Sequence, residues 1–373
     1  MLLPTLNDVG DLRGKKVLLR LDLNVPVENG EVTDAYRILR VEKTLAFLKE
    51  SGARTLIISH MEGKGGDSLQ PAAKYLSKKF DVSFALTLVE AQEQIASLQE
   101  GSFVLLENLR TWEGEKKNDP AFAQELASLA DIYVNDAFAV SHREHASIVG
   151  VPKLLPSFAG FLMSEEVEAL SKALAPEHPA LLILGGAKFE TKLPLAEKFL
   201  NIVDHLYLCG ALANDIYKAR GYEVGTSIVS NGTLSLEPLL NHPKVLVPVD
   251  VIAVGEGGRR VCAADEVKPD EKIEDAGPNA LADVTALIGK SAFVLWNGPL
   301  GEYEEGFDEG TVAVELAIAE SDAESIIGGG DSLAVASKLN LLERFSFVST
   351  GGGAMLDFLA HGTLPGIEAL RIK

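Results

Sequence analysis

Short apolar runs rich in Val, Ile and Leu recur along the whole chain, separated by stretches in which apolar residues return every three or four positions. The runs have the length of buried strands, and the stretches, such as 72–80 and 165–174, have the spacing of amphipathic helices. Alternation of strand and helix predicts parallel sheets, because parallel neighbours need a crossover connection. The predicted strands are 16–23, 55–58, 103–106 and 132–134, then 180–184, 205–208, 245–249, 292–296, 325–327 and 346–348.

The length of 373 residues favours two domains. Between them we place the segment 152–177, where two prolines precede a long helical pattern that ends near two more prolines. We therefore predict a first α/β domain over 1–158, a connecting helix over 159–176 and a second α/β domain over 177–359.

Charge and composition exclude several classes of function. The chain has 54 Asp and Glu against 34 Lys and Arg, a formal net charge of −20, which argues against a nucleic-acid partner. No apolar run approaches the ~18 residues that cross a bilayer, and 1–10 lacks the pattern of an export signal. Cys209 and Cys262 lack metal-site spacing and suit a reducing compartment as free thiols. We expect a cytoplasmic protein with no membrane partner.

Polar side chains follow every predicted strand of the first half, at the sheet edge where parallel sheets bind ligands. Arg20, Asp22 and Asn24 alternate with leucines, which predicts that they share one face of the first strand. The other groups are Arg37 downstream of that strand, Ser59 and His60 after the second, Arg110 after the third, and Asn135, Asp136, His142 and Arg143 after the fourth. A single arginine is often just a surface ion pair. Repetition over four strands predicts a site for a small anion with carboxylate or phosphate groups.

The strands of the second half end in glycine-rich turns instead. These turns contain 185–186, 210, 298, 328–330 and 351–353. We expect each to open a helix, whose N-terminal N–H groups can bind phosphate. Neither the dinucleotide pattern G-x-G-x-x-G nor the phosphate loop G-x-x-x-x-G-K-[ST] is present.

Two charged features accompany these turns. Lys188 and Lys192 stand four positions apart and would share one face of a helix that begins there. Asp331 follows the 328–330 turn, where an aspartate either caps a helix or meets a hard cation bound to phosphates. Both interpretations of Asp331 stay open.

Together the motifs resemble those of the phosphoglycerate kinases over nearly the whole chain. The matching segments are RLDLNVP (20–26), DAYRI (34–38), LENLR (106–110), NDAF (135–138), SHR (141–143) and FAGFLM (158–163), then GGAK (185–188) with Lys192, WNGPLG (296–301), GGGDS (328–332) and STGGGA (349–354). The resemblance implies two doubly wound parallel-sheet domains that face each other across a cleft. It also implies that the C-terminal segment 360–373 returns to the first domain.

The resemblance implies reversible phosphoryl transfer between 1,3-bisphosphoglycerate and Mg-ADP, giving 3-phosphoglycerate and Mg-ATP, in line after hinge closure. The substrate residues implied are Asp22, Asn24, Arg37, His60, Arg110 and Arg143. The nucleotide residues implied are Lys188, Lys192, Gly210, Asn297, Glu304, Gly329, Gly330, Asp331 and Ser332. Arg37 and Lys188 would be catalytic and Asp331 would lie near Mg²⁺. We expect a monomer.

The chain departs from the family pattern at two places. The family usually shows His-Leu-Gly-Arg after the second strand, whereas this chain has His-Met-Glu-Gly-Lys over 60–64 and lacks the arginine. We hypothesise that Lys64 supplies part of that charge; the alternative is that it is a solvated loop residue. The usual triple glycine after the sixth strand reads Cys209-Gly210-Ala211.

Two other functions stay open at this point. A catalytically weak nucleotide- and anion-binding protein of the same fold, acting as a sensor or scaffold, is compatible with the missing arginine. A two-domain NAD-dependent dehydrogenase would share the architecture but lacks the G-x-G-x-x-G turn.

Overall fold

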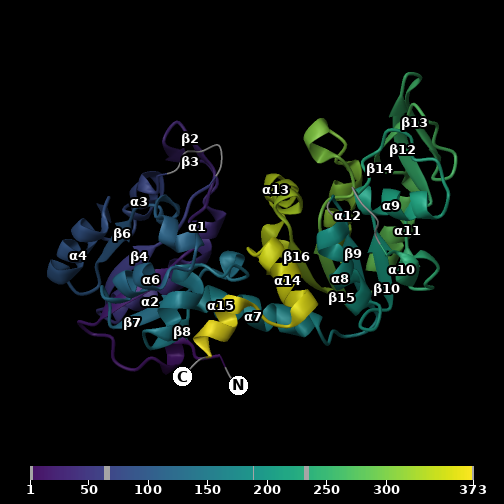
Figure 1. The fold of residues 1–373 in the computed structure, drawn as a ribbon. Helices are drawn as coiled ribbons and strands as arrows, with labels where there is room; N and C mark the ends of the chain where they lie inside the picture. The colour runs from purple at the N-terminus through teal and green to yellow at the C-terminus, as the bar shows by residue number, and fades with distance from the viewer. Residues whose placement is uncertain (1–2, 63–67, 188, 231–234, 372–373) are drawn as a thin grey trace. The chain divides into compact units, whose positions relative to one another are not determined.

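The computed structural model describes residues 3–62, 68–187, 189–230 and 235–371. The chain divides into two compact units, Met1–Glu168 with Thr363–Lys373, and Ala169–Gly362. We call them the N-terminal unit and the C-terminal unit (Figure 1). The division falls inside helix α7 (Phe161–Ala173).

The N-terminal unit contains a six-stranded parallel sheet in the order β5-β6-β4-β1-β7-β8. Its strands are β1 (Lys16–Arg20), β4 (Arg54–Ile58), β5 (Val82–Ala85), β6 (Phe103–Leu106), β7 (Ile132–Asn135) and β8 (Ser157–Ala159), with a hairpin of β2 (Val27–Glu28) and β3 (Glu31–Val32). Its helices are α1 (Tyr36–Arg40), α2 (Glu42–Glu50), α3 (Gln70–Leu76), α4 (Leu88–Ser97), α5 (Glu113–Lys116), α6 (Pro120–Ala127), the first part of α7, and α15 (Pro365–Leu370).

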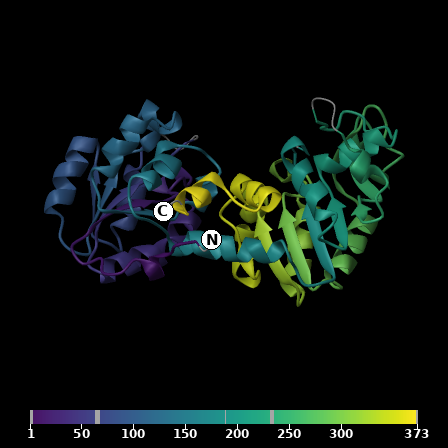
Figure 2. The same ribbon diagram turned by 60° about the horizontal axis from the view of Figure 1, so that its bottom comes forward.

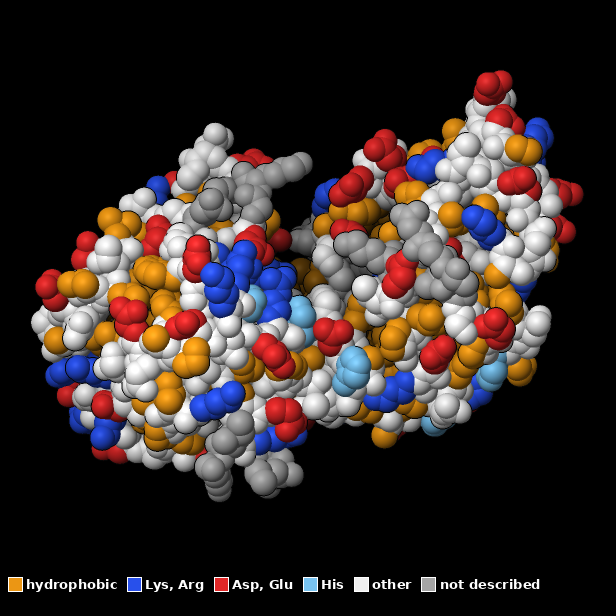
Figure 3. All heavy atoms as spheres, viewed as in Figure 1, with side chains coloured by type: hydrophobic (Ala, Val, Ile, Leu, Met, Phe, Trp, Pro, Cys, Tyr) orange, Lys and Arg blue, Asp and Glu red, His pale blue; other side chains and the backbone are white. Residues whose placement is uncertain are grey.

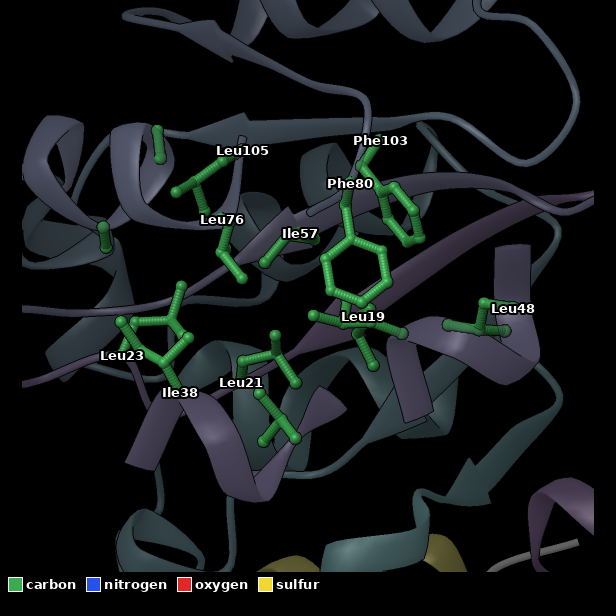
Figure 4. Packing of buried hydrophobic residues seen from close by; sticks show 14 of the residues in the cluster. Leu19, Leu21, Leu23, Ile38, Leu48, Ile57, Leu76, Phe80, Phe103 and Leu105 are labelled. Atoms are coloured by element: carbon green, nitrogen blue, oxygen red, sulfur yellow. The ribbon is translucent and has the colours of Figure 1, made fainter. Parts of the chain in front are cut away.

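Apolar side chains from the central strands pack against the covering helices to form the core of this unit. Leu19 and Ile57 come from neighbouring strands and are fully buried with Leu76 and Phe103 (Figure 4). The rings of Phe80 and Phe103 meet edge to face with centroids 5.7 Å apart. This burial on both faces explains why the strands read as continuous apolar runs.

The C-terminal unit contains a second six-stranded parallel sheet in the order β11-β10-β9-β15-β16-β17. Its strands are β9 (Ala180–Leu184), β10 (His205–Leu208), β11 (Val245–Leu246), β15 (Phe293–Asn297), β16 (Glu324–Gly328) and β17 (Phe347–Val348), beside an antiparallel sheet of β12 (Asp250–Gly255), β13 (Gly258–Ala263) and β14 (Lys272–Ala276). Its helices are α8 (Phe189–Phe199), α9 (Ala211–Ala219), α10 (Glu237–Leu240), α11 (Pro278–Ile288), α12 (Glu309–Glu320), α13 (Gly330–Lys338) and α14 (Gly353–His361).

Short turns of other helix types complete the described chain. The 3-10 turns are Leu6–Asp8, Leu109–Thr111, Phe138–Val140, Val151–Lys153, Tyr303–Glu305 and Leu342–Arg344, and Ala146–Gly150 is a π-helical turn. Cys209 and Cys262 are buried and free. Among the described residues, no helix combines the length and apolar character needed to cross a membrane.

The C-terminal helix α15 packs on the N-terminal unit (Figure 2, yellow). The backbone N–H of Gly366 donates to the carbonyl of Ser141 at 2.8 Å. A Cβ on Gly366 would lie 2.8 Å from the Cβ of Ser141, closer than ordinary contact allows. This close approach ties the last helix to the segment that carries Arg143.

The two parallel sheets confirm the predicted fold class. The predicted first strand 16–23 was too long, because β1 ends at Arg20. Asp22 and Asn24 therefore lie in the chain beyond the strand and not on one face of it. The glycine turns after β9, β10, β16 and β17 lead into α-helices, whereas the turn after β15 leads into the short 3-10 helix Tyr303–Glu305 before α12.

Candidate active site

In both sheets the order of strand connections reverses beside a central strand, which is where open α/β sheets form ligand crevices. In the N-terminal unit, β1 lies between β4 and β7, and Arg20 pairs in register with Ile58 and Asn135. In the C-terminal unit, β15 lies between β9 and β16, and Asn297 pairs with Leu184 and Gly328. The predicted polar and glycine-rich segments follow these strand ends.

Arg37 joins the two polar residues that follow β1. Its Nη1 lies 3.3 Å from Asp22 Oδ2 and donates to the carbonyl of Asn24 at 2.8 Å. Burial raises the pKa of Asp22, but the Arg37 guanidinium and the N–H of Asn24 outweigh it and leave the pKa below its usual value. Asp22 is therefore an ionised, buried acceptor, and Arg37, about one-third exposed, is held beside it.

His60 and Arg20 lie beneath this group. Arg20 is fully buried; its Nε donates to Ser147 Oγ at 3.0 Å and its Nη2 lies 3.3 Å from His60 Nδ1. Burial lowers the pKa of His60 to about 3; Asp22 opposes this shift and Arg20 adds to it. The imidazole is therefore neutral at pH 7, and Nδ1 accepts a hydrogen bond from the arginine.

Arg110 and Arg143 meet at the carboxylate of Glu62. Arg110 Nη1 donates to Glu62 Oε1, and Arg143 Nη1 lies 3.8 Å from Glu62 Oε2. The Arg110 side chain is only 6% exposed, and its Nε and Nη2 have no hydrogen-bond partner among the described residues. Burial lowers the pKa of Arg110; Glu62 opposes this and Arg143 adds to it. Figure 3 shows a group of basic and histidine side chains on the surface of the N-terminal unit.

A cavity of about 270 Å³ opens in the C-terminal unit. Its lining includes Gly186 and Gly210 at the strand ends, Tyr217 and Ile228 on an apolar side, and Asp331 at the start of α13. Gly210 has a φ of +59°, and a Cβ there would lie 2.8 Å from the backbone nitrogen of Gly186. Glycine is thus required at 210 both for its conformation and for the close turn.

Lys192, on α8, reaches back to the strand end. The residue is 7% exposed and its Nζ donates to the carbonyl of Gly185. Burial lowers the pKa of Lys192 to about 8, and Asp331 opposes the shift. A Cβ on Gly298 would lie 2.9 Å from the same Nζ. The lysine therefore sits inside the glycine-rich edge formed by β9 and β15.

Glu304 and Asp331 line the same cavity, together with Tyr303. Burial raises the pKa of Tyr303, and the carboxylates of Asp331 and Glu304 raise it further. The Asp331 side chain is exposed at the first turn of α13. An exposed carboxylate is an oxygen ligand of the kind that Mg²⁺ binds together with phosphate oxygens.

Some predicted nucleotide residues lie beside this cavity without lining it. Asn297 is buried, with its Nδ2 3.9 Å from Met355 Sδ, and a Cβ on Gly329 would approach its side chain at 3.4 Å. Ser332 is fully buried, while Gly330 begins α13 with open space around it. Lys188, Gly63 and Lys64 lie outside the described residues.

Lys116 is absent from the sequence-based prediction, although its Nζ lies 3.4 Å from Glu62 Oε1. Glu62 appears in that prediction only as part of the segment 60–64 that departs from the family pattern. Nothing in the sequence distinguishes Lys116 from the adjacent Lys117. Glu62 is also separated from each of its cationic neighbours by 48 or more positions in the chain. The one available signal was the departure from the family pattern at 61–64.

A basic cluster at one parallel sheet and a glycine-edged cavity at the other are the features that an α/β phosphotransferase needs. The family model for phosphoglycerate kinase matches residues 6–362. Phosphoglycerate kinases from Methylorubrum populi and Dictyoglomus turgidum are 41% and 40% identical, over 99% and 97% of this chain and 98% and 97% of their own lengths. The solved phosphoglycerate kinase of Coxiella burnetii is 38% identical with a TM-score of 0.85, and that of Pyrococcus horikoshii is 31% identical with a TM-score of 0.86. Each alignment covers 99% of this chain and 98% of the solved chain.

The chain therefore belongs to the phosphoglycerate kinase family. It is a phosphotransferase with a carboxyl group as acceptor, and its reaction is a step of glycolysis that uses a nucleotide substrate.

Proposed function

We propose that the N-terminal unit binds 3-phosphoglycerate or 1,3-bisphosphoglycerate and that the C-terminal unit binds ADP or ATP. The substrate residues of this proposal are Asp22, Asn24, Arg37, His60, Arg110 and Arg143. The nucleotide residues are Lys188, Lys192, Gly210, Asn297, Glu304, Gly329, Gly330, Asp331 and Ser332. The domain bounds of the proposal are those predicted from the sequence, 1–158 with 360–373, and 177–359.

The substrate assignment rests mainly on the burial and the incomplete hydrogen bonding of Arg110. Its guanidinium is almost fully withdrawn from water, yet two of its nitrogen atoms have no partner among the described residues. A buried cation with unused donors is costly unless an anion completes its hydrogen bonds. The neutral His60 nearby leaves the positive charge of Arg20, Arg110 and Arg143 available to such an anion.

The chemistry needs no general base. The acceptor carboxyl of 3-phosphoglycerate has a reference pKa of about 3.5 and is ionised at pH 7. Arg37 and Lys188 act by stabilising the negative charge that spreads over the phosphoryl oxygens during in-line transfer. Because the two substrates bind to different units, the transfer also requires a closing motion that brings them together.

Mg²⁺ fits the donor set at the cavity mouth. Asp331 is an exposed carboxylate on the lining, and one carboxylate with phosphate oxygens and water is a usual Mg²⁺ environment. When bound there, Mg²⁺ neutralises charge on the phosphate oxygens of the nucleotide. Lys192 and the N–H groups of Gly210 and Gly330 bind and orient the phosphates.

Two variants test the assignment of ligands to units. Arg110→Ala should weaken 3-phosphoglycerate binding by about 1.5–3 kcal/mol, the range for hydrogen bonds to charged groups, and leave ADP binding unchanged. Asp331→Asn should weaken Mg-ADP binding and leave 3-phosphoglycerate binding unchanged. Calorimetric titration of each ligand measures both effects. The opposite selectivity would reverse the assignment, and the absence of any effect of Arg110→Ala would remove it.

A further inference from the structure

The carboxylate of Glu62 lies among three cations that come from separate segments. Arg110 Nη1 donates to its Oε1, Lys116 Nζ lies 3.4 Å from the same oxygen, and Arg143 Nη1 lies 3.8 Å from Oε2. The backbone N–H of Glu62 donates to Asn24 Oδ1 at 3.0 Å, which fixes the start of the side chain. One small anionic group thus occupies the centre of the basic cluster.

An ordinary surface ion-pair network does not explain this arrangement. Exposed pairs contribute roughly 0–1 kcal/mol and usually hold both side chains in water. Arg110, in contrast, is 6% exposed and keeps Nε and Nη2 without a partner among the described residues. A pair that served stability alone would be expected to satisfy those donors. Glu62 satisfies one donor and leaves the others for a second anion.

The charges around Glu62 explain why it is there. Arg110 and Arg143 repel each other, and burial disfavours the charged form of Arg110. A carboxylate between them relieves this repulsion when no ligand is bound. The Glu62 side chain is 40% exposed, so it can turn into water when a more highly charged anion takes its place.

We propose that Glu62 is a built-in counter-anion of the phosphate subsite, displaced by the substrate phosphate, and that Lys116 is the third cation of that subsite. This inference rests on the proposed substrate role of Arg110 and Arg143. A phosphate carries more charge and more acceptor oxygens than a carboxylate, so it outcompetes Glu62. Glu62 nevertheless lowers the affinity for the substrate, whereas Lys116 raises it.

The chain offers a matched control for each residue. Lys117 is adjacent to Lys116 but pairs with Glu113 at 2.6 Å, and the two side chains are 69% and 85% exposed. Replacing either member of this pair changes the net charge by the same amount as replacing Glu62 or Lys116. The control residues pair with each other and are more exposed than Glu62 and Lys116, which are 40% and 56% exposed.

The test measures two constants in each variant: KM for 3-phosphoglycerate, and the inhibition constant Ki of inorganic phosphate as a competitor of 3-phosphoglycerate. Glu62→Gln should lower both constants by about three- to tenfold, the scale of one partly buried charge, with KM for ATP unchanged. Lys116→Met should raise both by a similar factor. Glu113→Gln and Lys117→Met should change neither. The differences between variants should shrink in 0.5 M KCl, because the Debye length there is only about 4 Å and salt screens these charges.

A KM that stays the same or rises in Glu62→Gln would overturn the counter-anion role, and a Lys116→Met result equal to that of Lys117→Met would overturn the role of Lys116. Melting temperatures identify a variant that does not fold, in which case Glu62→Ser replaces it. Arg110→Ala, measured alongside, distinguishes a failure of the proposed substrate site from a failure of the proposed roles of Glu62 and Lys116. If it also leaves KM unchanged, the proposed substrate site itself is wrong; if it raises KM, only the present inference fails.

Discussion

The buried position of Lys192 should make nucleotide affinity depend on pH in a range where most lysines do not titrate. Burial lowers its pKa to about 8. Lysine is a base, so its charge is present below that value and lost as the pH rises through it. We expect the free enzyme to bind ADP through the charged form.

The magnitude follows from the fraction of charged lysine. With a pKa of about 8, roughly nine-tenths of Lys192 is charged at pH 7 and roughly one-tenth at pH 9. If only the charged form binds phosphate, Kd for ADP rises about tenfold over that range, or about 1.4 kcal/mol. Without this lowered pKa the side chain would stay charged throughout.

Two substitutions isolate the effect. Lys192→Arg keeps its charge at every pH used and should give a flat profile, because a guanidinium has a pKa above about 12. Lys192→Met should bind ADP more weakly at every pH and also give a flat profile. Calorimetric titration of Mg-ADP from pH 7 to pH 9 measures all three proteins. A wild-type Kd that stays constant, or a Lys192→Met profile that rises like the wild type, would refute the reasoning.

Two further predictions concern stability and the glycine edge. Burial raises the pKa of Asp136 to about 7 from 3.8, so the folded protein favours the protonated carboxyl and loses stability as the pH rises between these values. Urea unfolding should show wild type losing up to about 4 kcal/mol relative to Asp136→Asn from pH 4 to pH 7, and parallel curves would contradict this. Gly210→Ala should weaken ADP binding and lower stability, whereas Gly221→Ala, which has a φ of +86° but open space, should lower stability only. Equal ADP affinities in the two variants, measured by calorimetry, would show that the close turn at Gly210 is not needed.

The sequence predicted the parallel strands that are buried along their length, and it missed β5 and β8, which are only partly buried. The run 103–106 is β6 itself, and 180–184 and 205–208 are β9 and β10. In the antiparallel sheet of β12 to β14, β13 was missed because it has only one buried residue, Cys262. β12 is buried over its first four residues, so exposure does not explain why it was missed. A half-exposed antiparallel strand lacks the continuous apolar run that marks a buried parallel one.

The candidate site could be predicted residue by residue but not as a set of contacts. Arg110 and Arg143 follow strands, and that position alone selected them. Their meeting at Glu62 depends on how loops from different strands approach each other, which no local pattern encodes. The neutrality of His60 likewise depends on burial by neighbours distant in the chain. Sequence patterns therefore identified the two arginines and missed both Lys116 and the anion between them.

The return of α15 to the N-terminal unit affects the order in which the two units can complete their folding during synthesis. Ala369 belongs to the same small core as Val140 and Ile148, and Gly366 bonds to Ser141, two residues before Arg143. These contacts are made by residues that follow the whole C-terminal unit in the chain and are therefore synthesised after it. The N-terminal unit can thus complete its packing only after the C-terminal unit has been translated, and the segment that carries Arg143 gains this support late.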